Sequence, residues 1–199
     1  LEGQSLMDYA TDPLVSIVIC LLIIVGGLGF FVWGDIYDCR FNPKKFQFYT
    51  RMALIGTAIL LVGGTFLFLL FERNNPYYEG YNFGERLLCS FFNATTARTA
   101  GYFTTPPESL FNSGCLLMII LMFIGACSGS TGGGIKVSTF TVIMVGMVAV
   151  MRGKKDITIG KRRIENSLVG QALAIFAAYL TLTVVATLII NTIEPDEVA

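Results

Sequence analysis

The 199 residues are 54% apolar and 14% charged, with a formal net charge of zero and a mean hydropathy of +0.66. These values exclude an ordinary soluble domain and indicate an integral membrane protein, and the balanced charge gives no reason to expect nucleic acid as a partner. The sequence has no histidine, the commonest metal ligand and general base, so we expect neither an enzyme nor a cofactor in this chain.

Three apolar runs have the length of a membrane span. Asp12-Pro13 is a helix-start signal, and Leu14 to Trp33 then provides the roughly 20 residues that cross hydrocarbon. Further spans are expected from Met52 to Phe71 and from Leu168 to Ile193, each ended by charge and proline. We interpret the glycines within the first two spans as sites of close helix packing: Gly26, Gly27, Gly29, Gly63 and Gly64. The five cysteines are scattered and odd in number, so we expect buried, unpaired thiols.

A shorter helix is predicted after the second span. Asn82 and Glu85 have the spacing of a capping box, which predicts a helix from Phe83 to Ala94 that is too short to cross a bilayer. Its apolar face for packing against the spans comprises Phe83, Leu87, Leu88, Phe91 and Phe92. The C-terminal end of its dipole points at Thr96 to Tyr102, a polar run that ends in glycine and tyrosine. Irregular backbone at membrane depth is tolerated only where it is buried in protein or lines a water-filled cavity. Carbonyl groups that line such a cavity can bind a cation in place of its water shell.

The remaining apolar segment, Leu110 to Met151, is too long for one span. As a single helix it would measure about 63 Å, about twice the hydrocarbon thickness. The glycine-rich stretch from Gly125 to Gly134 is expected to break it, leaving two halves, 110–124 and 135–151, that are each too short to span well. This is the broken-helix pattern of channels and transporters, although small residues also serve close helix packing.

Two basic residues accompany these runs. Lys136 follows the glycines, where it either forms part of a gate or extends its ammonium group towards the water. Arg98 precedes Thr99, and we expect it to hold the turn through an ion pair with Glu85 or Glu108 rather than to bind an ion.

The other basic residues predict the orientation. Most of them gather in two loops, which the positive-inside rule places in the cytoplasm: Arg40, Lys44, Lys45 and Arg51, and then Arg152, Lys154, Lys155, Lys161, Arg162 and Arg163. The segment from Glu72 to Ser109 then lies outside, in a multi-pass protein of the cell membrane.

Two adjacent runs resemble a known family. Thr96 to Tyr102 resembles the third-repeat filter of the Trk/Ktr/HKT superfamily of potassium-translocating subunits, and Phe123 to Lys136 is similar to the gating loop that follows that filter. Thr99 to Tyr102 also parallels the Thr-Val-Gly-Tyr filter of potassium channels, and Gly26 to Phe30 is similar to the family's second-repeat exit helix. The Ktr-like subunit is the most similar type.

The resemblance implies an all-α membrane fold of span, pore loop and span, with a re-entrant half-helix, a selectivity filter and a broken third span. It assigns residues 1–51 to the end of repeat two, 52–151 to repeat three, and 152–199 to the start of repeat four. We therefore expect this chain to be part of a longer, four-repeat protein that takes up potassium. The implied partners are the lipid bilayer, a second copy of the protein and a cytoplasmic nucleotide-binding regulatory subunit.

The resemblance also assigns residues to the site. The implied filter residues, which bind the transported potassium and are the only metal site, are Thr99, Ala100, Gly101 and Tyr102. The implied gate comprises Gly125, Ser128, Gly129, Ser130, Thr131, Gly132, Gly133, Gly134 and Lys136. The alternative is a secondary transporter for a small organic solute, with its binding site at the broken helix.

Overall fold

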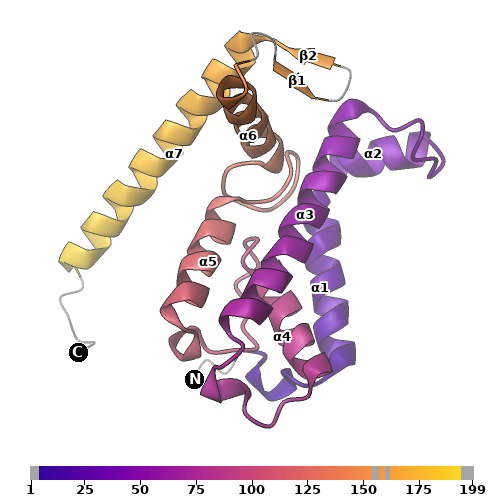
Figure 1. Ribbon diagram of the computed structural model, residues 1–199. Helices are drawn as coiled ribbons and strands as arrows, with labels where there is room; N and C mark the ends of the chain where they lie inside the picture. Colours follow the sequence, from indigo (N-terminus) through magenta and orange to yellow (C-terminus); the bar gives the residue numbers. More distant parts are fainter. Residues whose placement is uncertain (1–4, 154–156, 160–161, 194–199) are drawn as a thin grey trace. The chain divides into compact units, whose positions relative to one another are not determined.

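The computed structural model describes residues 5–153, 157–159 and 162–193 and confirms an all-α membrane fold with a broken helix. The chain divides into two compact units, Leu1–Ser138 and Thr139–Ala199 (Figure 1). The first unit holds α1 (Pro13–Leu28), α2 (Phe30–Asp38), α3 (Phe48–Phe71), α4 (Phe83–Thr96), α5 (Asn112–Phe123) and the first residues of α6 (Val137–Met151). Short 3₁₀ turns lie at Met7–Tyr9, Pro76–Tyr78 and Pro107–Ser109.

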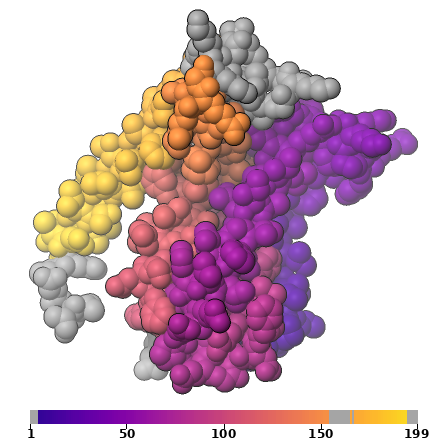
Figure 2. Space-filling view, viewed as in Figure 1, coloured from indigo at the N-terminus to yellow at the C-terminus, as the bar shows by residue number. Residues whose placement is uncertain are grey.

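The first predicted span is bent. Asp12 caps α1 as expected, since its carboxylate accepts a hydrogen bond from the backbone N–H of Leu14 at 2.9 Å. The prediction of one span to Trp33 is wrong, because α1 ends at Leu28 and α2 leaves it at 86°. Gly29 forms the bend with φ of +81°, and a Cβ there would lie 2.6 Å from the carbonyl oxygen of Ser128. Helix α2 therefore projects from the side of the unit (Figures 1 and 2).

Helix α3 crosses the full length of the first unit. It ends at Phe71 as predicted and begins four residues before the expected Met52. One face exposes a stripe of apolar side chains at helical spacing, comprising Ile55, Ile59, Val62, Phe66 and Leu70. The buried residues of α3 include three threonines, so this helix has an apolar outer face and a partly polar inner one.

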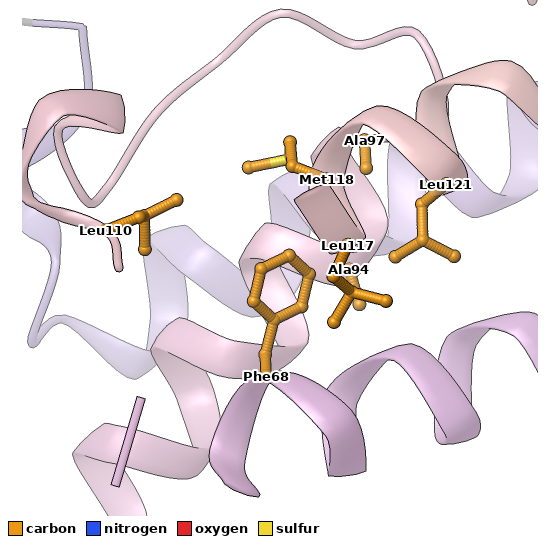
Figure 3. Close-up of a cluster of buried hydrophobic side chains, with 7 residues drawn as sticks. All are labelled: Phe68, Ala94, Ala97, Leu110, Leu117, Met118 and Leu121. Atoms are coloured by element: carbon orange, nitrogen blue, oxygen red, sulfur yellow. The ribbon is translucent and has the colours of Figure 1, made fainter. Parts of the chain in front are cut away.

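The inner face of α3 packs on α4 and α5 around Phe68, which has no exposed surface. Figure 3 shows this side chain facing the end of α4 and one side of α5, in a cluster of Phe68, Ala94, Ala97, Leu110, Leu117, Met118 and Leu121. Gly64 permits the approach, since a Cβ there would lie 3.2 Å from the Cβ of Ala94 and 3.1 Å from Cδ1 of Leu121. The interpretation of Gly64 as a packing glycine is therefore confirmed.

A buried carboxylate joins the end of α3 to the start of α5. Glu72 is 4% exposed and accepts hydrogen bonds from the Asn75 amide at 2.5 Å and from the backbone N–H of Phe111 at 3.1 Å. The Asn75 amide also donates to the carbonyl oxygen of Ser109 at 2.7 Å. These bonds close the long connection that contains α4, because both of its ends meet at Glu72.

The second unit contains most of α6, a small hairpin and α7 (Asn166–Ile193). Strands β1 (Ile157–Ile159) and β2 (Arg162–Ile164) pair antiparallel, with Thr158 opposite Arg163, where a loop without strands was expected. Helix α6 packs on the start of α7 through Ala149 and Val169. Helix α7 ends at Ile193 as predicted, and its apolar side chains are largely exposed within the chain.

The helix lengths agree with the expected membrane elements. Helices α3 and α7 are long and apolar enough to cross a membrane, as are α1 and α2 if this bent pair counts as one span. Helices α5 and α6 are apolar but shorter, which confirms the broken third segment. The cysteines are all free; Cys20, Cys89 and Cys127 are buried as expected, whereas Cys39 and Cys115 are only partly buried.

Adjacent glycines test the packing of α3. Gly64→Ala is expected to destabilise the full-length protein by about 1–3 kcal/mol, because the new methyl group presses on Ala94, whose backbone must move. Gly63→Ala is the matched control, since no atom lies within 4 Å of its Cβ. The measurement is thermal unfolding in detergent, and equal midpoints for the two variants would contradict this packing.

Candidate functional site

Helix α4 carries the site at its C-terminal end. Its capping box is present, with the Glu85 carboxylate accepting from the backbone N–H of Asn82 at 2.8 Å, and the helix ends two residues beyond the predicted Ala94. The predicted packing face is only partly correct: Phe92 is fully buried, whereas Phe83 and Leu87 are exposed. The buried residues gather towards the C-terminus and include the polar Ser90, Asn93, Thr95 and Thr96.

The turn after α4 has an unusual backbone. Thr99 has φ of +72° and Gly101 has φ of +77°, so two residues of the predicted filter are left-handed. A left-handed conformation is uncommon for threonine and is kept only where the surroundings impose it. Two hydrogen bonds help to do so: the N–H of Ala100 donates to the Thr96 carbonyl at 3.1 Å, and the Thr96 hydroxyl donates to the Tyr102 carbonyl at 2.5 Å.

The carbonyl groups of Thr99, Ala100 and Gly101 belong to a run from Ala97 to Gly101 for which the described part of the chain provides no donor. Within the described part of the chain, no N–H or O–H donates to the carbonyl oxygens of Thr99, Ala100 or Gly101. These residues are exposed or half-exposed, although the end of α4 just before them is buried. The Tyr102 carbonyl accepts one bond and keeps a second lone pair. The run therefore combines exposed or half-exposed residues with backbone oxygens that the described part of the chain leaves without a donor.

The chain that leaves the turn is held by aromatic hydroxyls. Tyr77 donates to the Thr104 carbonyl at 3.4 Å, and the Tyr78 hydroxyl lies 3.1 Å from Oγ1 of Thr105. Burial raises the pKa of Tyr78, so its hydroxyl stays protonated and can keep this bond. On the other side, the N–H of Leu6 donates to the carbonyl of Phe103 at 2.9 Å. The chain that leaves the turn is thus anchored by two separate segments.

The glycine-rich stretch forms a closed loop between α5 and α6. Its ends pair side by side: Gly125 N–H donates to the Ile135 carbonyl at 2.9 Å, and Ile135 N–H donates to the Phe123 carbonyl at 3.0 Å. No side chain fits between the ends, because a Cβ on Gly125 would overlap the carbonyl of Gly133. Much of the irregular backbone of this broken segment is therefore satisfied by its own chain.

The loop also contacts the bend between α1 and α2. Cys127 N–H donates to the Gly27 carbonyl at 3.0 Å, and Phe30 N–H donates to the Gly129 carbonyl at 3.1 Å. The Tyr49 hydroxyl of α3 donates to the carbonyl of Ser128 at 3.2 Å. Lys136 is half-buried, and its ammonium donates to the Gly132 carbonyl at 2.6 Å, so this cation is directed back to the loop.

The turn and the loop touch each other at Gly132. A Cβ built on Gly132 would lie 2.8 Å from Oγ1 of Thr99 and 2.5 Å from the Cβ of Ala126. Gly133 has more room, with Cγ2 of Thr99 at 3.8 Å as its nearest atom. The structure thus brings Thr99 of the predicted filter against the predicted gate, about 30 residues further along the chain.

The expected partners of Arg98 are wrong. Glu85 caps the opposite end of α4, and the buried Arg98 side chain instead donates from Nη2 to the Thr57 hydroxyl at 3.4 Å. Sequence reasoning missed Thr57 and Tyr49 because they lie in or next to an apolar span. For Thr57 the sequence did contain a signal: Thr50, Thr57 and Thr65 recur on one face of α3, which indicates a polar, buried face.

The short helix α4 ends at a turn with free carbonyl groups, and this turn lies beside a broken apolar segment. This combination is typical of membrane channels and transporters. Residues 1–197 match the family model TrkH, described as a cation transport protein, and the chain belongs to this family. It is 39% identical over 194 residues to the potassium/sodium uptake protein NtpJ of Enterococcus hirae, covering 98% of this chain and 43% of that protein. It is 43% identical over 179 residues to Ktr system potassium uptake protein B of Vibrio alginolyticus, covering 88% of this chain and 39% of that protein.

A solved structure shares the fold. The crystal structure of the potassium transporter TrkH from Vibrio parahaemolyticus matches with a TM-score of 0.70 at 19% identity, covering 94% of this chain and 41% of that one. The chain therefore spans less than half the length of the proteins that it matches.

Gly132 offers a test of the contact between turn and loop. Gly132→Ala is expected to destabilise the full-length protein by about 1–3 kcal/mol, because the added methyl group overlaps both Ala126 and Thr99. The neighbouring Gly133→Ala meets only an ordinary contact and should cost less. Thermal unfolding of both variants decides the matter: a Gly133→Ala effect as large as that of Gly132→Ala would contradict the geometry.

Proposed function

We propose that this chain is part of a potassium uptake protein and that residues 99–102 supply one of four strands of its selectivity filter. The observation that carries the proposal is the run of free carbonyl groups at Thr99, Ala100 and Gly101. In this run Thr99 and Gly101 have a left-handed backbone conformation. Carbonyl oxygens replace the water shell of a cation when several of them converge on it. One strand offers too few oxygens, so three further strands of the full-length protein complete the site.

The surroundings of the turn favour a cation. Helix α4 ends at the turn, and its C-terminal dipole places about half a negative charge there. Arg98 precedes the turn, but its side chain points back into the unit to Thr57, away from the free carbonyls. The turn therefore exposes partial negative charge and hides its one cationic group.

The loop from Gly125 to Gly134, with Lys136, acts as the gate in this proposal. Two features support it: the loop touches the turn through Gly132 and Thr99, and its two ends are paired with each other. The bond from Lys136 to the Gly132 carbonyl keeps a positive charge beside the ion path. The proposed gate comprises Gly125, Ser128, Gly129, Ser130, Thr131, Gly132, Gly133, Gly134 and Lys136.

The proposal extends to the remaining assignments, which the resemblance to the family implies. Residues 1–51, 52–151 and 152–199 belong to repeats two, three and four, with both basic loops in the cytoplasm. The full-length protein acts in the cell membrane as a dimer with a cytoplasmic nucleotide-binding subunit. The names of the relatives support potassium as the transported ion, since NtpJ is a potassium/sodium uptake protein and the Ktr relative a potassium uptake protein.

Gly101→Ser in the full-length protein tests the filter. The serine Cβ meets no atom within 4 Å, but a left-handed backbone costs a residue with a side chain about 1–2 kcal/mol, so the carbonyls shift. The expected result is a fall in the ratio of Rb⁺ to Na⁺ uptake into proteoliposomes. Gly80→Ser is the matched control, since Gly80 has φ of +91° and an equally open Cβ position but lies outside the turn. An unchanged ratio for Gly101→Ser would sink the filter assignment.

Deleting residues 126–133 tests the gate. The deletion is feasible because Gly125 and Gly134 already lie side by side, so they can be joined directly. The Rb⁺ flux is expected to rise if the loop restricts the path, and no rise would favour a role in helix packing.

Competition separates this function from transport of an organic solute. Inhibition of K⁺ uptake by Rb⁺ supports the filter, whereas uptake of an organic solute that Rb⁺ does not inhibit would overturn it.

A further inference from the structure

Arg98 carries a buried charge for which packing gives no reason. The residue is 6% exposed, its Nε has no hydrogen-bond partner, and no carboxylate forms an ion pair with it among the described residues. Burying a guanidinium costs several kcal/mol unless its surroundings compensate, so an apolar residue would be cheaper at this position. What Arg98 does provide is a long polar side chain that starts next to Thr99 and ends at another helix.

The contact continues from that helix to the glycine loop. The Thr57 hydroxyl, which accepts from Arg98 at 3.4 Å, also lies 3.6 Å from the thiol sulfur of Cys127. Thr57 is 4% exposed and Cys127 is 1% exposed. Cys127 is itself fixed in the loop, since its carbonyl accepts from the Ser130 hydroxyl at 2.6 Å. Three buried side chains thus form a polar chain from the turn, through α3, to the loop.

This polar chain begins at the residue that precedes Thr99. Thr99 follows Arg98 directly, has φ of +72°, and is in contact with the glycine at position 132. A left-handed threonine persists only where neighbouring groups hold it. Arg98 on one side and Gly132 on the other are the groups positioned to do this.

We infer that Arg98 is a positioning residue: through Thr57 and Cys127 it holds the Thr99 backbone at the carbonyl spacing that distinguishes potassium from sodium. The inference rests on the proposed function, since it presumes that Thr99 to Gly101 bind the cation. The physical reason is that the two ions differ in radius and dehydration cost, so a small shift of the carbonyls changes their relative affinity. Arg98, Thr57 and Cys127 touch no ion and act only through the backbone.

The test is at Thr57, which lies in neither the turn nor the loop. Thr57→Val keeps the shape of the side chain and removes the hydroxyl, whereas Thr57→Ser keeps the hydroxyl. In the full-length protein in proteoliposomes, Thr57→Val is expected to lower the ratio of Rb⁺ to Na⁺ uptake by about two- to tenfold, the equivalent of one hydrogen bond, and to change the KM for Rb⁺. Thr57→Ser is expected to restore the ratio.

Thr65→Val is the matched control on the same helix. Its hydroxyl is also buried but donates to the carbonyl of Leu61 in its own helix at 2.6 Å, so its removal should leave the ratio unchanged. If Thr57→Val does not accumulate in the membrane, Cys127→Ala breaks the same chain from the loop side and is measured in the same way.

The outcomes separate the inference from the proposed function. A fall in the ratio for Thr57→Val, with rescue by serine, supports the positioning role. A reduced maximal rate at an unchanged ratio would mean that the contact only stabilises the fold, and it would overturn the inference. A wild-type protein that does not transport Rb⁺ would overturn the proposed function itself, whatever the variants do.

Discussion

The backbone of a membrane-embedded chain must find its hydrogen-bond partners within the protein, and the rest of this structure depends on how that requirement is met. The glycine-rich break between α5 and α6 leaves many N–H and C=O groups outside helices. Pairing of its two ends, together with bonds to Gly27, Phe30 and Tyr49, satisfies many of them. The carbonyls of Thr99, Ala100 and Gly101, by contrast, accept no hydrogen bond within the described part of the chain.

Glycines meet different physical needs in this chain. Gly64 provides room where α3, α4 and α5 converge, and Gly132 provides room where the turn meets the loop. Gly29 and Gly101 instead adopt backbone conformations that other residues adopt at a cost. The distinction matters for interpreting variants, because an added methyl group at Gly64 moves a neighbouring helix whereas one at Gly101 acts on its own backbone. A glycine count alone cannot separate these roles.

The first unit links the turn to the fold at several levels. Phe68 packs against the end of α4, Glu72 joins the two ends of the connection that contains α4, and tyrosines hold the segment that leaves the turn. The turn itself remains exposed, although the residues that support it are buried.

The sequence by itself determined the membrane class, the capped half-helix, the polar run after that helix and the break at Gly125–Gly134. These features depend on composition, on local capping chemistry and on the length of each apolar segment, and all three can be read from residues that are close together in the sequence. The tertiary structure decided the bend at Gly29, the exposure of Phe83 and the partner of Arg98. Gly29 bends where the Ser128 carbonyl approaches, and Arg98 finds Thr57, 41 positions earlier, while Thr57 meets Cys127, 70 positions later. Periodicity cannot reveal such contacts, because they arise only when helices that are distant in sequence pack together.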